Sequence, residues 1–330
     1  MGEPLRLVFM GSDPVALPLL DWLAGGGSSV ATIAGIFTGP DRPSGRGQAV
    51  RPNAVKAWSA GRSIEVQQPE KLDAAALAAL GDLRPDVSLV VAYGHILREE
   101  FISLPRLGTL NVHASLLPKY RGASPIQTAV ASGESETGMT LMRIVRALDG
   151  GPFAGEQRVA IWPLDTASDV ESRLARAAVP LVARSLPLLA RGELAFHEQD
   201  HSKASFCRRL DKADGVLDFS APAAVLAARI NGLNPWPSVS VDLAGASIKL
   251  GLADAVGAAS QGIPGTVLGA DGDGLQVATG SGTLRLRQLQ RPGGRMLAAA
   301  EFLRGFPVPS GTAIASGPMP PLSSPSPFRR

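Results

Sequence analysis

Runs of hydrophobic residues alternate with amphipathic segments through the first half of the chain. Residues 5–10 form an apolar run that predicts a buried strand, and Pro14 follows at a position that suits the first turn of a helix. Apolar runs at residues 30–37 and 86–92 predict two more strands. The last run is almost wholly apolar, as expected when helices cover both faces of a sheet. This alternation predicts an α/β fold with a mostly parallel sheet, whose functional residues lie beyond the carboxyl ends of the strands.

A long amphipathic helix is predicted over residues 166–191, because hydrophobic residues recur there at helical spacing with charged residues between them. Pro180 and Pro187 fall inside this segment. Proline lacks the backbone N–H and clashes with the preceding turn of a helix. We therefore expect a kinked helix or two shorter helices. Residues 193–205 are polar and predict a linker after a first domain that spans residues 1–192.

Short runs in which hydrophobic and polar residues alternate, separated by glycines, follow this linker. They predict the strands of a small β-barrel within a second domain over residues 206–311. The runs lie at residues 239–243, 248–252, 265–268, 275–279 and 283–289. Residues 312–330 are rich in proline and serine, a composition typical of a disordered tail.

The composition fits a globular protein of two domains. A chain of 330 residues can bury two cores, and 45% hydrophobic with 18% charged residues is usual for a soluble protein. The single cysteine argues against a disulfide framework and fits a reducing cytoplasm. Residues 1–6 lack the basic segment of a secretion signal, and the apolar run after them is too short to span a membrane. We therefore expect a cytoplasmic protein that does not associate with membranes, and expect it to be a monomer.

Charge is spread unevenly, although the net charge is only +3. Residues 284–287 alternate leucine with Arg285 and Arg287, so one face of a strand would present both arginines while the leucines enter the core. Arg291 and Arg295 follow in the next turn. These arginines are a candidate phosphate-binding track, and a merely solvated strand face is the competing interpretation.

Candidate chemistry is concentrated in residues 111–122 and in a short segment around Asp149. Asn111 and His113 stand at alternate positions where the strand-like run 107–112 ends, so both side chains point to one face. Asp149 follows another apolar run and could also lie at a strand's exit. An amide donor, a titratable ring and a carboxylate that converge in this way suit the transfer of an acyl group to an amine.

The proposed division of labour follows from the charges that develop during acyl transfer. Asn111 and a protonated His113 could donate to the oxyanion of a tetrahedral carbon, and Asp149 could accept the proton of the attacking amine. No nucleophilic side chain is needed if the acyl donor is already activated. Ser115 lacks the G-x-S-x-G setting of a nucleophile and better suits a turn, and Cys207 is typical of a small buried residue. Taken alone, a polar strand end beside a Pro–Gly loop is the simpler interpretation.

Cofactor motifs of other kinds are missing from the sequence. The turn after the first predicted strand is Gly11-Ser12-Asp13 and does not match the G-x-G-x-x-G of dinucleotide-binding folds. His197 and His201 have the spacing of two metal ligands on a helix, but no third ligand accompanies them, so we expect no metal.

Residues 111–122 resemble, without a gap, the formyltetrahydrofolate-dependent formyltransferase superfamily. Its hallmarks are an Asn-x-His strand end, a Ser-Leu-Leu-Pro turn, an Arg-Gly pair and a distant Leu-Asp-x-Gly, which residues 148–151 supply. The resemblance implies a Rossmann-like catalytic domain followed by an OB-like β-barrel that binds tRNA. It also implies 10-formyltetrahydrofolate as the co-substrate, and Asn111, His113 and Asp149 as the catalytic residues.

Four other stretches, at residues 40–47, 90–94, 234–237 and 264–267, resemble the branch of this superfamily that formylates methionyl initiator tRNA. The implied partners are folate and initiator methionyl-tRNA. The resemblance further implies that two short segments form the wall of the folate pocket. Their residues are Val91, Ala92, Tyr93, Gly94, Ser115, Leu116, Leu117 and Pro118.

Contacts to tRNA are implied at a loop near the N-terminus. Arg42 matches an arginine of the loop that enters the acceptor arm in this branch, and Arg46 and Arg51 lie beside it. In the second domain Arg285, Arg287 and Arg295 are the expected phosphate contacts. The chain departs from the branch at Gln48-Ala49, where a lysine is usual, and at Gly294-Arg295, where Gly-Lys is usual. These departures concern individual tRNA contacts and leave the folate chemistry unchanged.

Two other functions remain open on the sequence. A sister formyltransferase or a formyl-folate hydrolase acting on a small substrate would share the three catalytic residues, but would need neither the 38–50 loop nor the second domain. A non-catalytic RNA-binding protein would keep the barrel, but would have no physical need for three converging polar side chains. Activity on a charged initiator tRNA separates the three functions.

Overall fold

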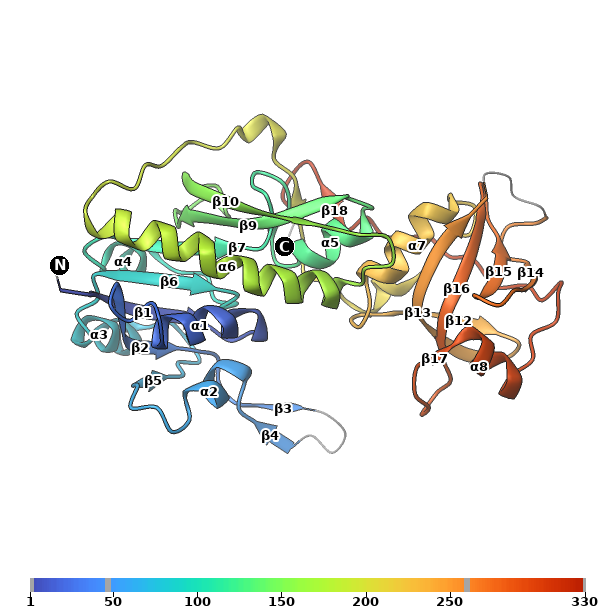
Figure 1. Ribbon diagram of the computed structural model, residues 1–330, viewed down its shortest axis with the longest axis horizontal. Helices are drawn as coiled ribbons and strands as arrows, with labels where there is room; N and C mark the ends of the chain where they lie inside the picture. Colours follow the sequence, from blue (N-terminus) through green and yellow to red (C-terminus); the bar gives the residue numbers. More distant parts are fainter. Residues whose placement is uncertain (1–2, 45–48, 258–261, 329–330) are drawn as a thin grey trace. The chain divides into compact units, whose positions relative to one another are not determined.

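A computed structural model describes residues 3–44, 49–257 and 262–328 (Figure 1). Contacts divide the chain into two compact units. The N-terminal unit comprises Met1–Arg121, Gly138–Val159 and Glu171–Ala204, and the C-terminal unit comprises Gly122–Thr137, Ala160–Val170 and Ser205–Arg330. The sequence predicts one boundary at residues 193–205. The contacts, in addition, group two earlier segments with the later part of the chain.

A seven-stranded sheet forms the centre of the N-terminal unit, in the order β10-β9-β7-β6-β1-β2-β5. The pairs among β5, β2, β1, β6 and β7 are parallel, and β9 is antiparallel to β7. The predicted mostly parallel α/β sheet is thus confirmed. The strands are β1 Leu5–Gly11, β2 Ala31–Phe37, β5 Val66–Gln67, β6 Val87–Val91, β7 Thr109–His113, β9 Glu136–Arg143 and β10 Phe153–Ala160.

The first strand leads into a helix as the sequence predicts. Asp13 accepts a hydrogen bond from the Val15 N–H at 3.0 Å, which caps the 3-10 turn η1 (Pro14–Ala16) before α1 (Leu17–Ala24). Apolar side chains from α1 are buried beside the sheet. The other short helices of this unit are α2 Ala54–Ser59, α3 Ala74–Asp82 and α4 Glu99–Ser103, with a small hairpin of β3 Arg42–Ser44 and β4 Ala49–Arg51.

The long helix is present where the sequence predicts it, but it does not divide into two shorter helices. It runs unbroken as α6 (Ala167–Ala190), with Pro180 and Pro187 inside it. An interior proline costs a helix about 3 kcal/mol. Along α6 this cost is offset because an apolar stripe is buried, and each large apolar side chain contributes about 1.5–3 kcal/mol. The buried residues include Leu174, Ala178, Leu181, Val182, Leu186 and Leu189. Burial of the stripe therefore outweighs the local preference of proline.

An antiparallel sheet dominates the C-terminal unit, in the order β12-β13-β16-β15-β14, with β17 on β16. Five of its strands overlap the glycine-separated runs that predicted them: β12 Val239–Leu243, β13 Ala246–Val256, β14 Val267–Ala270, β15 Leu275–Ala278 and β16 Thr283–Gln290. No run predicted the short strand β17, Leu297–Ala298. Helices α7 (Ala223–Gly232) and α8 (Ala299–Gly305) contribute Leu226, Ile230 and Phe302 to its core. The remaining elements are β8 Arg121–Gly122, α5 Pro125–Ala131, η2 His201–Lys203, β11 Phe206–Cys207, η3 Lys212–Gly215 and β18 Ser323–Ser324.

The C-terminal tail is ordered over its described part, contrary to the predicted disorder of residues 312–330. Ile314 and Leu322 are buried, and β18 pairs antiparallel with β11. Backbone bonds join Ile314 to Gly265 and Gly317 to Leu217. Composition misled the prediction because a few apolar residues, spaced among the prolines, are enough to fix the tail on the C-terminal unit. Arg329 and Arg330 lie outside the described residues.

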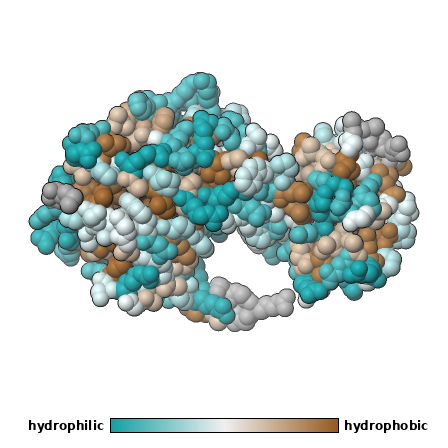
Figure 2. Space-filling view, in the orientation of Figure 1, coloured by the Kyte–Doolittle hydropathy of each residue, from teal (hydrophilic) through white to brown (hydrophobic). Residues whose placement is uncertain are grey.

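Surface hydropathy is mixed. On the face shown in Figure 2, hydrophobic residues are interspersed with hydrophilic ones. Within the described ranges, no helix combines the length and the apolar character that crossing a membrane requires.

A buried ionic cluster ties the tail to the C-terminal unit. Asp214 has no exposed surface and receives two hydrogen bonds from the Arg208 guanidinium. Arg229 donates to the backbone carbonyls of Asp214 and Pro320, at 2.9 and 3.0 Å. Burial alone would raise the pKa of Asp214, but the hydrogen bonds from Arg208 and the Asp211 N–H, with the two arginine charges, lower it below its ordinary value. The carboxylate is thus stabilised in its charged form.

Replacing Asp214 by asparagine should lower the free energy of unfolding by about 3 kcal/mol near neutral pH, because two partly buried arginines lose their counter-charge. The folded pKa lies below the unfolded one, so this stabilisation is present above about pH 4 and is lost as the pH falls through the folded pKa. Urea unfolding of the wild type and D214N should therefore show a difference that shrinks on acidification. An equal difference at pH 7 and pH 3 would contradict this account.

Candidate active site

Strand β7 carries Asn111 and His113 in the middle of the N-terminal sheet. Asn111 is paired with Val90 of β6 on one side and with Met142 of β9 on the other. His113 is the last residue of the strand and is paired with Thr140. Because the two residues are two positions apart, their side chains share one face of the sheet. Both therefore stand at the carboxyl end of a strand, as the sequence predicts.

His113 and Asp149 are brought together although 36 positions separate them. The distance from His113 Nδ1 to Asp149 Oδ2 is 3.8 Å, and the side chains are 6% and 17% exposed. His113 Nε2 lies 2.9 Å from the carbonyl oxygen of Tyr120. A carbonyl can only accept, so Nε2 carries the hydrogen and Nδ1 faces the carboxylate. Protonation of Nδ1 would convert this contact into an ion pair.

The loop after His113 is fixed by its own polar groups. The Ser115 hydroxyl donates to the Lys119 carbonyl at 2.6 Å. The Thr140 hydroxyl donates to the Ser115 carbonyl at 2.6 Å and accepts from the Leu117 N–H at 3.2 Å. The Leu117–Pro118 peptide bond is cis. Ser115 is buried and its hydroxyl shapes the loop, which agrees with the turn interpretation of this residue.

The Asp149 loop is held through its main chain. Asp149 adopts φ +45°, a left-handed conformation that is uncommon for a residue with a side chain. A Cβ on Gly151 would lie 2.1 Å from the Arg143 carbonyl oxygen, so only glycine fits there. The Gln199 amide donates to the carbonyls of Asp149 and Gly151, at 2.9 and 2.7 Å. Gln199 also accepts hydrogen bonds from Arg121.

Sequence reasoning missed Gln199, and assigned Arg121 only to a motif. Gln199 lies in the polar segment 193–205 that reads as a linker, and no periodicity or motif distinguishes it there. Its position in the site depends on folding that brings this segment beside a loop 50 residues earlier.

The predicted folate wall begins at the end of β6. Val91 is buried there, and Ala92 and Gly94 both adopt positive φ, at +47° and +79°. Tyr93 lies between these two residues and is buried, and the centre of its ring is 4.8 Å from that of His95. Burial raises the pKa of the Tyr93 hydroxyl, which finds no hydrogen-bond partner within the described residues. The second wall segment, Ser115, Leu116, Leu117 and Pro118, lies in the loop after β7.

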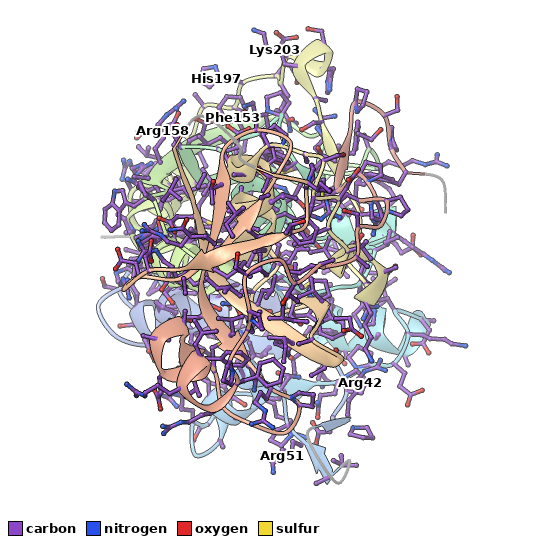
Figure 3. All side chains as sticks on the ribbon, turned by 90° about the vertical axis from the view of Figure 1, so that its right-hand side faces the viewer. Arg42, Arg51, Phe153, Arg158, His197 and Lys203 are labelled. Atoms are coloured by element: carbon purple, nitrogen blue, oxygen red, sulfur yellow. The ribbon has the colours of Figure 1, made fainter. Side chains whose placement is uncertain are left out.

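A cavity of about 390 Å³ is lined by Tyr93 and Gly94 of the predicted wall and by part of the predicted tRNA-facing loop, whereas Val91, Ala92 and residues 115–118 do not line it. Arg42 and Arg51, which Figure 3 labels, are paired across the β3–β4 hairpin. They line this cavity together with Tyr93 and His95. Burial, and next the charge of Arg42, lower the pKa of His95, which favours its neutral form. Arg46 lies outside the described residues. Two predicted groups are thus neighbours in one cavity.

Asn53 anchors the base of the hairpin. Its amide donates to the Gly39 carbonyl at 2.8 Å, and its side-chain oxygen accepts from the Val55 and Lys56 N–H groups as the cap of α2. The arginines therefore project from a fixed base.

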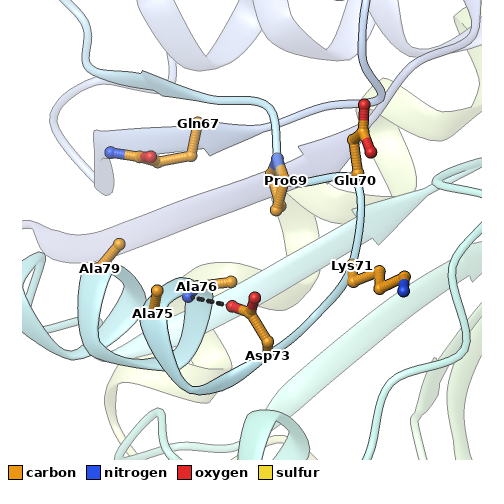
Figure 4. Close-up of a pocket in the computed structure, with 8 residues that line it drawn as sticks. All are labelled: Gln67, Pro69, Glu70, Lys71, Asp73, Ala75, Ala76 and Ala79. Carbon is orange, nitrogen blue, oxygen red and sulfur yellow. Dashed lines mark hydrogen bonds between the residues drawn. The ribbon is translucent and has the colours of Figure 1, made fainter.

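Another cavity, of about 490 Å³, lies between the β5 edge and α3 (Figure 4). It is lined by Gln67, Glu70 and Lys71 among others, and Asp73 caps α3 beside it. None of the predicted site residues lies in it.

The arginines of β16 are paired with carboxylates. Arg285 and Arg287 both bind Asp254 of β13, with shortest contacts of 2.6 and 2.9 Å, and Arg285 also lies 3.2 Å from Asp273. The alternation of leucine inside and arginine outside is confirmed. Arg295 forms an ion pair of 2.8 Å with Glu301.

His197 and His201 do not share a helix. His197 pairs with Phe153 through two backbone bonds, and their rings lie 6.1 Å apart (Figure 3). His201 lies in η2. Within residues 3–44, 49–257 and 262–328, no group of three or more His, Cys, Asp or Glu is arranged to hold a metal ion.

Two solved structures share this fold at low sequence identity. WlaRD, a sugar 3N-formyl transferase examined with dTDP and 5-N-formyl-THF, gives a TM-score of 0.64 at 14% identity, over 86% of this chain and 98% of that chain. HypX from Aquifex aeolicus, in complex with tetrahydrofolic acid, gives 0.60 at 14% identity, over 91% and 47%. These likenesses establish the fold.

Sequence relatives are much closer. A methionyl-tRNA formyltransferase of Aromatoleum aromaticum is 40% identical over 311 residues, 94% of this chain and 97% of the relative. One of Pseudomonas syringae pv. syringae is 43% identical over 298 residues, 90% and 93%. The chain also matches the family described as Formyl transferase over residues 5–186 and its C-terminal domain over residues 209–307. The chain therefore belongs to the formyl transferase family, among the relatives named methionyl-tRNA formyltransferase.

Proposed function

We propose that this protein transfers the formyl group of 10-formyltetrahydrofolate to the α-amino group of methionyl initiator tRNA. The observation that supports the proposal is the 3.8 Å contact between His113 Nδ1, at the end of β7, and the Asp149 carboxylate, with Asn111 two positions before His113 on the same strand. The relatives that share nearly the whole chain bear the name of this activity. Formyltetrahydrofolate supplies a formyl group already activated on nitrogen, so no nucleophilic side chain is required.

The proposed reaction gives a step to each of these residues. The substrate amine attacks the formyl carbon, and the Asp149 carboxylate accepts the proton that the amine loses. The Asn111 amide and the protonated His113 donate to the oxygen that becomes negative. The bond from carbon to the folate nitrogen then breaks, and Asp149 returns a proton to that nitrogen. Because the Tyr120 carbonyl accepts the hydrogen of His113 Nε2, the hydrogen that His113 donates to the negative oxygen must be the one on Nδ1, which lies 3.8 Å from Asp149 Oδ2.

Folate binding is proposed at the wall formed by Val91–Gly94 and Ser115–Pro118. The buried Tyr93 hydroxyl offers a polar contact, and the apolar side chains around it suit a flat ring system. The Ser115 hydroxyl shapes the wall and does not take part in the chemistry.

Recognition of tRNA is proposed at the β3–β4 hairpin. Arg42 and Arg51 are direct cross-strand neighbours, an arrangement of like charges that is unfavourable on its own. A phosphate placed between them would relieve this repulsion. Arg46, Arg285, Arg287 and Arg295 are further proposed contacts, but a phosphate at the β16 arginines must compete with Asp254.

The proposed setting is that of a monomer acting in the cytoplasm, where its tRNA substrate is used. All three catalytic side chains come from one chain, so a second copy is not needed to complete the site.

The first experiment is a formylation assay with 10-formyltetrahydrofolate and methionyl initiator tRNA, beside methionyl elongator tRNA and free methionine. Formylation of the initiator alone is expected. Folate turnover without formylated tRNA would assign the site to a small-substrate formyltransferase or a hydrolase, and the absence of both reactions would favour a non-catalytic RNA-binding protein.

Replacing Asp149 by asparagine, or His113 by alanine, should lower kcat about 10²–10⁴-fold, because each removes a proton acceptor or an oxyanion donor. The Michaelis constants for folate and tRNA should change far less. Steady-state kinetics, with circular dichroism to confirm folding, test this. Full activity in either folded variant would contradict the assigned roles.

Replacing Arg51 by alanine should weaken tRNA binding and reduce the slope of log affinity against log salt by about 1, as expected for one lost phosphate contact. The matched control is Arg176→Ala, which removes an exposed arginine of α6 away from the cavity. Filter binding across salt concentrations measures both. Equal slopes for the wild type and R51A would exclude Arg51 from phosphate contact.

A further inference from the structure

The Gln199 side chain is only 4% exposed and uses its full hydrogen-bonding capacity. Its two N–H groups donate to the carbonyls of Asp149 and Gly151. Its oxygen accepts twice from Arg121, from Nε at 3.2 Å and from Nη2 at 2.6 Å. An amide has two donors and two acceptor lone pairs, so none remains unused.

We infer that Gln199 is a positioning residue for formyl transfer, which holds the Asp149 carboxylate in register with His113 by binding the main-chain carbonyls of Asp149 and Gly151. The inference rests on the proposed function, because it acts through the role assigned to Asp149. Gln199 itself contacts the loop's backbone and not the Asp149 carboxylate.

The orientation of the amide is unambiguous. If the amide were flipped, its oxygen would face two carbonyl oxygens and its NH₂ group would face a guanidinium. Both contacts would be repulsive. Arg121 therefore fixes the end of the side chain that must donate. Arg121 is in turn buried, and its Nη2 donates to His201 Nδ1 at 2.9 Å.

The Asp149 loop needs such support. A left-handed conformation at a residue with a side chain costs of the order of 1 kcal/mol and persists only when the surroundings impose it. Gly151 is confined by the Arg143 carbonyl, and the Arg143 N–H donates to the Pro152 carbonyl at 2.9 Å. Gln199 adds hydrogen bonds to the carbonyls of Asp149 and Gly151, the residues before and after Gly150.

Two consecutive residues, Tyr120 and Arg121, act on both His113 and Asp149. The carbonyl of Tyr120 orients His113, and the next residue, Arg121, orients Gln199. Gln199 then holds the main chain of Asp149. A shift of Asp149 relative to His113 thus requires at least one of these buried contacts to break. Burial lowers the pKa of Arg121, and the negative charge of Asp149 opposes that shift, which agrees with their closeness.

The test is a double-mutant cycle between Gln199→Leu and Asp149→Asn, measured as kcat for initiator tRNA formylation. Gln199→Leu alone should lower kcat about 10²-fold, since a displacement of about 1 Å at a reacting group costs that much. In the D149N background it should cost less than about 3-fold, because the carboxylate that it positions is already gone. The Michaelis constants should change little.

A merely structural role would give a different pattern. The matched control is Asn231→Leu, which removes a buried amide that also bonds main-chain groups, the N–H and carbonyl of Ala253. Its effect on kcat should be the same with and without Asp149. Equal losses from Gln199→Leu in the two backgrounds would overturn the inference while leaving the role of Asp149 intact. Full activity of D149N would overturn both.

Should Gln199→Leu fail to fold, Gln199→Glu serves in the same cycle. It keeps the shape and the acceptor for Arg121, but it replaces the donors to the loop by a charged oxygen that repels the carbonyls of Asp149 and Gly151. A loss of about 10²-fold that disappears in the D149N background is again expected, and an unchanged kcat in Gln199→Glu would overturn the inference.

Discussion

The hydrogen bond from His113 Nε2 to the Tyr120 carbonyl sets the chemistry of the site, because it decides which ring nitrogen meets Asp149. A histidine free to rotate or to change tautomer could present either nitrogen, and could donate only part of the time. The bond exists because the loop after β7 returns to the ring within seven residues. Thr140, the cross-strand neighbour of His113, holds that loop through the Ser115 carbonyl and the Leu117 N–H. The pairing of β7 with β9 therefore also fixes the loop that orients the His113 ring.

Much of this arrangement can be predicted from hydrophobic pattern. Apolar runs located β1, β2 and β6 correctly, because a strand covered on both faces leaves a continuous signal in sequence. Alternation located β16 and placed its arginines on the outer face. The pattern failed where distant packing overrides local preference. Two prolines do not break α6, and apolar anchors order a tail whose composition suggests disorder. Such effects depend on neighbours that only the folded chain provides.

The residues of the candidate site likewise include some that the sequence indicates and one that it does not. Asn111, His113 and Asp149 stand beside turn residues at predicted strand ends, and the resemblance to a known superfamily singled them out. Gln199 has no comparable signal, since a glutamine in a polar segment is mostly exposed. Its burial arises because four polar groups meet there and satisfy one another. Leaving any of them unpaired would cost about 1–3 kcal/mol, so the cluster is stable only as a whole.

The two sets of arginines proposed to bind tRNA differ in whether they form ion pairs with carboxylates. Asp254 binds both arginines of β16, and burial, which would raise its pKa, is outweighed by their hydrogen bonds and charges, which lower it. A phosphate there would exchange one anion for another and gain little net free energy. Arg42 and Arg51 differ, because no carboxylate within the described ranges lies at ion-pair distance from either. A phosphate at the hairpin replaces repulsion between two cations by attraction. Under the proposed function, electrostatic affinity should therefore arise mainly at the hairpin, beside the cavity that Tyr93 lines, and the β16 arginines should contribute chiefly to the stability of the C-terminal unit.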